Sequence, residues 1–142
     1  MFKLLVPIDG SENSLAALRH VMKLRDQFRE PIELHLLNVQ SPVASGAVKM
    51  FISPQQLNDY YREEGEAALK EARALLESAG MHYQYHIGVG ELAATIVGYA
   101  TEKGCQQIAM GTHGRGSLAG ALLGSVATKT IHLSLVPVLL VR

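Results

Sequence analysis

The feature that most constrains the fold of this chain is an alternation of short apolar runs with longer segments of helical periodicity. Parallel strands joined by crossover helices produce this alternation. Five runs rich in Val, Ile, Leu or Tyr are expected to be strands: Lys3–Ile8, Ile32–Val39, His82–Ile87, Gln107–Met110 and Val136–Val141. The pattern therefore predicts an α/β fold of the Rossmann-like kind, an open five-stranded parallel sheet with helices on both faces.

Four segments with helical spacing separate the expected strands. Ser11 or Asn13 can cap the first helix, and Pro54 suits the first turn of the second. After the second strand, Ser41–Ser53 keeps no sustained period, so we expect a mobile loop there. The expected helices run from about Ser11 to before Pro31, from Pro54 to about Ala79, from Glu91 to Lys103, and within Ala119–Leu133.

Length and charge restrict the classes of function. With 142 residues, 48% of them hydrophobic, the chain is expected to form one domain over residues 1–142 with a core between the sheet and two helix layers. Its 13 acidic and 13 basic residues balance, so nucleic acid is not an expected partner. The apolar runs are much shorter than the roughly 20 residues that span a bilayer, and no secretory leader is evident. We therefore expect no membrane partner and a cytoplasmic location. The single cysteine, Cys105, fits a reducing compartment, and we expect it to be a small buried residue at the entry to a strand.

A glycine-rich segment follows the fourth expected strand directly. Glycine has no Cβ, so its backbone can adopt positive φ, approach a ligand closely and point amide hydrogens at an anion. Ser125 can cap the following helix or contact a phosphate, and Arg115 can supply countercharge. A turn needed only for tight packing of strand and helix is the alternative. The glycines stand at positions 111, 114, 116, 120 and 124.

Two better-known phosphate motifs fit this segment poorly. Gly111–Ser117 has the glycines of a P-loop, but Ser117 occupies the position of the essential lysine, which disfavours Walker-type hydrolysis. Gly114–Ala119 satisfies a dinucleotide fingerprint, yet it follows the fourth strand, and the position about 20 residues further on is apolar rather than acidic. NAD is therefore not the expected ligand.

The glycine spacing does match a third pattern. Two residues separate Gly111 from Gly114, and nine separate Gly114 from Gly124, which Ser125 follows. In this pattern the chain resembles the universal stress protein family, whose members with the complete pattern bind ATP. The resemblance implies strand order 3-2-1-4-5, with a ligand crevice between strands one and four. It covers nearly the whole chain through three further landmarks, Leu5–Ser11, Asn38-Val39 and Pro137–Arg142.

Carried over to this chain, the resemblance implies an adenine-nucleotide site for ATP, ADP or AMP. The backbone of Val39 would contact adenine, with Pro7 and Asp9 at the base and ribose. Asp9 is also the candidate ligand for Mg²⁺, or alternatively a turn aspartate that caps the amides of Ser11 or Glu12. The candidate nucleotide-binding residues are Pro7, Asp9, Val39, Gly111, Gly114, Arg115, Gly116, Gly124, Ser125 and Val126.

Three functions remain open at this point. We expect a stress-response or signalling protein that binds ATP as a dimeric switch, because no catalytic base accompanies the candidate serines. The alternatives are a slow ATPase or phosphotransferase, and a scaffold or chaperone-like dimer with a vestigial pocket. An apolar last strand is a template for pairing, and the resemblance also implies a homodimer through Val136–Val141. The six histidines show no spacing typical of a zinc site, so we expect no metal cluster among them.

Overall fold

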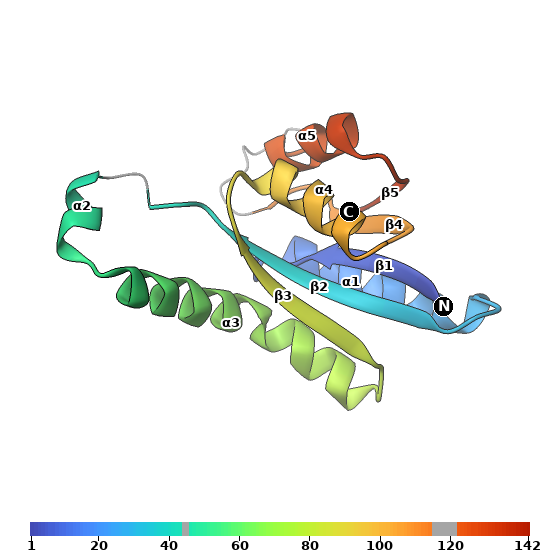
Figure 1. Cartoon of the computed structure of the whole chain (residues 1–142). Helices are drawn as coiled ribbons and strands as arrows, with labels where there is room; N and C mark the ends of the chain where they lie inside the picture. The colour runs from blue at the N-terminus through green and yellow to red at the C-terminus, as the bar shows by residue number, and fades with distance from the viewer. Residues whose placement is uncertain (44–45, 115–121) are drawn as a thin grey trace.

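The computed structural model describes residues 1–43, 46–114 and 122–142, and it contains one parallel five-stranded sheet (Figure 1). The strand order is β3-β2-β1-β4-β5, so the predicted Rossmann-like α/β fold is confirmed together with its order. In the register, Leu4 of β1 pairs with Leu34 of β2 on one side and Gln107 of β4 on the other. The strands are β1 (Phe2–Pro7), β2 (Ile32–Gln40), β3 (Tyr83–Val89), β4 (Gln107–Gly111) and β5 (Val138–Val141).

Two helices begin where their sequence signals place them. The Ser11 side chain accepts a hydrogen bond from the backbone N of Ser14 at the start of the first helix. Ser53 and Gln56 form a reciprocal capping box at the start of the longest one. Besides the short 3₁₀ turn Arg25–Gln27, the described helices are α1 (Glu12–Leu24), α2 (Gly46–Phe51), α3 (Pro54–Ser78), α4 (Leu92–Glu102) and α5 (Ser125–Leu133).

Two helix layers cover the sheet, with α1 and α3 on one face and α4 and α5 on the other (Figure 1). Because side chains alternate along a strand, each strand feeds both layers. On β1, Leu4 and Val6 pack toward α1 and α3, whereas Leu5 packs toward α4 and α5. Cys105 lies just before β4 with 4% of its surface exposed, as predicted, and burial raises the pKa of its thiol.

The structure corrects two expectations from the sequence. The segment Ser41–Ser53 is not an irregular loop throughout, because Gly46–Phe51 forms α2, which lies beyond the edge of the sheet (Figure 1). Tyr60, which the periodicity places on the inner face of α3, is 50% exposed, because the first turns of α3 also extend past the sheet (Figure 1). None of the helices within the described ranges is long and apolar enough to cross a membrane.

Candidate functional site

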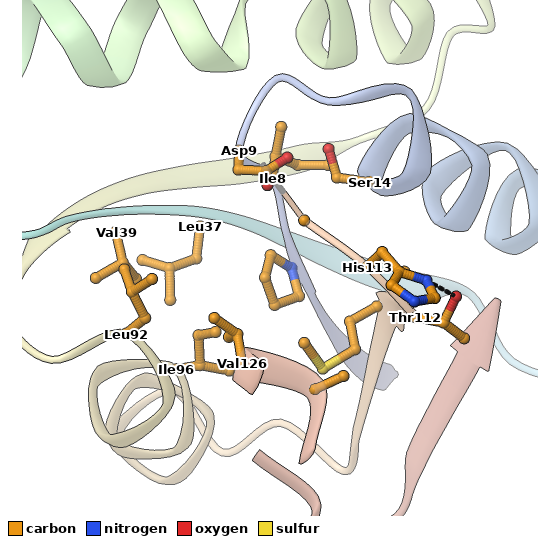
Figure 2. Close-up of a pocket in the computed structure, with 15 residues that line it drawn as sticks. Ile8, Asp9, Ser14, Leu37, Val39, Leu92, Ile96, Thr112, His113 and Val126 are labelled. Carbon is orange, nitrogen blue, oxygen red and sulfur yellow. Dashed lines mark hydrogen bonds between the residues drawn. The ribbon is translucent and has the colours of Figure 1, made fainter. Parts of the chain in front are cut away.

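A cavity of about 180 Å³ opens at the carboxyl ends of β1, β2 and β4 (Figure 2). From β1 the chain winds to β2 on one side and later to β4 on the other, so the cavity lies where the winding direction reverses. Open α/β sheets bind ligands at such switch points, because the loops after adjacent strands diverge and leave a crevice. The sheet order thus explains the position of the cavity.

The walls of the cavity are mostly apolar. Pro7, Leu37 and Met110 reach it from β1, β2 and β4, all on the sheet face that carries α4 and α5. Figure 2 shows Val39 and Leu92 near one another at one end of this wall. The wall is completed from the helices by Ile96, Val126 and Ala127. A slot of this kind suits a flat, weakly polar ring better than a charged group.

Polar groups gather on the opposite rim, at the ends of β1 and β4 (Figure 2). The Asp9 carboxylate accepts a hydrogen bond from the backbone N of Ser11 at 2.8 Å, so the alternative interpretation as a turn aspartate is confirmed for the Ser11 amide. Its second oxygen faces Gly114, where an added Cβ would come within 2.8 Å of it. Thr112, which is 7% exposed, lies with its hydroxyl 3.1 Å from Nδ1 of His113. Among the described residues, the rim therefore carries one carboxylate, two hydroxyls including that of Ser14, and an imidazole.

At the glycines around the cavity, the missing Cβ allows other atoms to come close, and it is not needed for a positive φ. None of Gly111, Gly114 and Gly124 has φ in the left-handed region, so that part of the prediction is wrong for these three. A Cβ on Gly111 would lie 2.8 Å from the backbone O of Asn13. The packing interpretation thus holds for Gly111, while Gly114 leaves the cavity rim without a side chain.

The start of α5 also differs from the expectation. Gly124, not Ser125, is the N-cap, and it makes no side-chain capping bond. The predicted capping role of Ser125 is therefore wrong; Ser125 is an exposed first residue of the helix. The Gly124 amide donates to the backbone O of Thr112 at 2.6 Å, which ties the loop end to the end of β4. In this conformation that amide already has an acceptor.

Six of the ten sequence-predicted residues lie around one cavity. Ser125 lies beside it in a neighbouring hollow, Gly124 is buried and does not line it, and Arg115 and Gly116 fall outside the described residues. The sequence analysis missed most of the apolar wall, although the alternation along β2 and β4 contains the information needed to find Leu37 and Met110. The six residues that line the cavity are Pro7, Asp9, Val39, Gly111, Gly114 and Val126.

Comparison with known proteins places this geometry in a family. A model described as the universal stress protein family matches residues 1–142. The chain belongs to this family. Universal stress protein YxiE of Bacillus subtilis is 33% identical over 145 residues, covering 99% of this chain and 98% of that protein. The solved structure of universal stress protein MJ0577 of Methanocaldococcus jannaschii is 33% identical with a TM-score of 0.84, covering 99% of this chain and 94% of that one.

Two more distant universal stress protein structures contain a nucleotide. One from Arabidopsis thaliana has AMP bound; it is 16% identical with a TM-score of 0.69, covering 99% of this chain and 91% of that chain. One from Archaeoglobus fulgidus is in complex with dAMP; it is 19% identical with a TM-score of 0.66, covering 100% and 98%. At these identities the two structures establish a shared fold with this chain.

Proposed function

We propose that this protein binds an adenine nucleotide in the cavity at the carboxyl ends of β1, β2 and β4. The adenine occupies the apolar slot beside Val39, and the phosphates extend toward the glycine segment and the start of α5. The observation that carries this proposal is the combination of an apolar slot with a rim kept open at Gly114. Relatives of the same fold that hold AMP or dAMP support it.

ATP is the proposed ligand, with Mg²⁺ at Asp9. Mg²⁺ binds through one or two carboxylates together with phosphate oxygens and water, rather than in a cage of protein groups. Asp9 is the one carboxylate among the described residues that line the cavity, so the donor set fits a phosphate-bound Mg²⁺. The charge of the ion would offset that of the phosphates, and the hydrogen bond from Ser11 would hold the carboxylate in place.

The proposed biological unit is a homodimer formed through β5 that responds to the nucleotide. β5 is an edge strand next to β4, and Leu133 and Leu135, which precede it, are 48% and 85% exposed. An apolar edge of this kind favours pairing with a second copy. Because α5 connects the cavity wall to β5, an occupied cavity and the proposed interface share one helix.

Isothermal titration of the purified protein with Mg·ATP tests the binding proposal. Gly114→Val would push a branched side chain against Asp9 and into the rim, so we expect at least tenfold weaker ATP binding. Gly98→Val is the matched control, because a Cβ there meets no atom within 4 Å and the residue lies on the exposed side of α4. Absence of binding by the wild type at millimolar Mg·ATP would contradict the proposal.

A further inference from the structure

A second hollow of about 430 Å³ adjoins the cavity and shares Leu92 and Val126 with it. The cavity alone, at about 180 Å³, is smaller than the roughly 300–1,000 Å³ typical of small-molecule sites. A nucleotide whose base fills the cavity must therefore place part of its length outside. The hollow provides that space, and it is lined by Ser41, Pro42, Gly90, Glu91, Leu92, Ser125, Val126 and Lys129.

Lys129 is the one cation among the described residues that line this hollow. It lies four residues after Ser125 on α5, so both side chains project from the same side of the helix. Its Nζ is 3.8 Å from Oε1 of Glu91. The other carboxylate oxygen of Glu91 accepts from the backbone N of Ala94 at 2.7 Å and caps α4. Glu91 thus holds Lys129 across the hollow while it fixes the start of a helix.

The ion pair between Lys129 and Glu91 is weak enough for a ligand phosphate to replace Glu91. The side chains of Lys129 and Glu91 are 64% and 52% exposed, and their separation is long for a charge-assisted hydrogen bond. A phosphate carries more charge than a carboxylate and offers more acceptor oxygens. A terminal phosphate in the hollow would therefore compete well for the ammonium group, without breaking the cap that Glu91 makes to α4.

We propose that the hollow is a subsite for the terminal phosphates of the nucleotide, and that Lys129 leaves Glu91 to contact them. This inference rests on the proposed nucleotide function, and it explains how the site would distinguish ATP from AMP. A nucleoside monophosphate ends within the glycine rim, whereas a triphosphate reaches the hollow. Lys129 is then a specificity-determining residue that favours ATP over AMP, and Glu91 is the competitor that weakens this preference.

Titrations with Mg·ATP and with AMP on the wild type and four variants test this assignment. In Lys129→Gln we expect about tenfold weaker ATP binding, the loss of one charge-assisted contact, with AMP affinity unchanged. In Glu91→Gln, whose amide oxygen can still cap α4, we expect ATP to bind about two- to fivefold more tightly and AMP as before. Lys70→Gln, on the exposed side of α3, removes the same charge from the other face of the sheet and should change neither affinity.

The possible results separate the two proposals. If the wild type binds ATP but Lys129→Gln leaves the ratio of ATP to AMP affinity unchanged, the subsite is wrong and the nucleotide site stands. If the wild type binds neither nucleotide, the proposed function fails and the subsite fails with it. Lys129→Arg keeps the charge and should retain the preference for ATP; loss of the preference in this variant would also overturn the assignment.

Discussion

The two faces of the sheet are built from the same strands but differ in how completely they are filled. Toward α1 and α3, side chains such as Leu34, Leu36 and Leu69 have no exposed surface, and they form one continuous cluster. Toward α4 and α5 the buried cluster of described residues is smaller, and near the carboxyl ends of the strands it gives way to the cavity beneath Ile96. One face of the sheet is closed and the other is open at one end.

This difference separates stability from binding in space. Close packing of the α1 and α3 face supplies dispersion contacts and hydrophobic burial that do not depend on a ligand. The α4 and α5 face forgoes part of that packing where its wall borders open volume. A ligand with an apolar ring would replace the missing contacts, so we expect ligand binding to stabilise this face more than the other.

Leu69→Ala against Ile96→Ala is the most direct test of this contrast, and it has the largest expected effect. Leu69 is fully buried between α3 and the sheet, so its truncation should lower the free energy of unfolding by about 3–5 kcal/mol. Ile96 already borders the cavity and loses fewer contacts, so we expect about 2 kcal/mol. Urea denaturation of both variants measures the two losses. Equal losses would show that the two faces are packed alike.

Gly111→Ala and Gly98→Ala test how tightly the backbone is packed at two glycines, and we expect them to change the stability of the protein in opposite directions. A methyl group on Gly111 would lie 2.8 Å from the Asn13 carbonyl oxygen, and this backbone contact cannot move aside cheaply, so we expect a loss of about 1–3 kcal/mol. Gly98 lies in an exposed helical position without close neighbours, and alanine there should stabilise the protein by about 0.5–1 kcal/mol. Thermal unfolding distinguishes the signs. A neutral Gly111→Ala would leave ligand approach as the reason for glycine at that position.

The sequence predicted the closed face better than the open one. Apolar periodicity and helix-start signals such as Ser11 and Pro54 act locally, and they determined the strands and most helix limits to within two or three residues. The resemblance also assigned Pro7, Asp9 and Gly111 to one site, and in the structure they line one cavity. What it did not predict depends on contacts between distant segments: that the Gly124 amide is taken by Thr112, and that Glu91 meets Lys129.

Another contact between distant segments joins two histidines on adjacent strands. Nδ1 of His35 lies 2.9 Å from Nε2 of His86, and Nε2 of His35 lies 3.1 Å from Oε1 of Glu33. His82, which the sequence analysis places at the start of the third strand, precedes β3 and is exposed. A neutral pair can share one proton across the 2.9 Å contact, whereas two imidazolium rings at that distance repel one another.

The smallest expected effect follows from this pair. Burial lowers the pKa of His86 below its ordinary value of 6.5, and His35 and Lys103 lower it further, while Glu102 opposes the shift. The folded state holds this proton less tightly than the unfolded state, so protonation of His86 favours unfolding. The contribution of neutral His86 to the free energy of unfolding is therefore complete above about pH 6.5 and is lost as the pH falls from there through the folded pKa. In His86→Gln this part of the pH dependence should disappear. Urea denaturation at several pH values from 8 to 5 measures it, with the exposed His132→Gln as the control. If His86→Gln lost stability on acidification as steeply as the wild type, His86 would not be the group responsible.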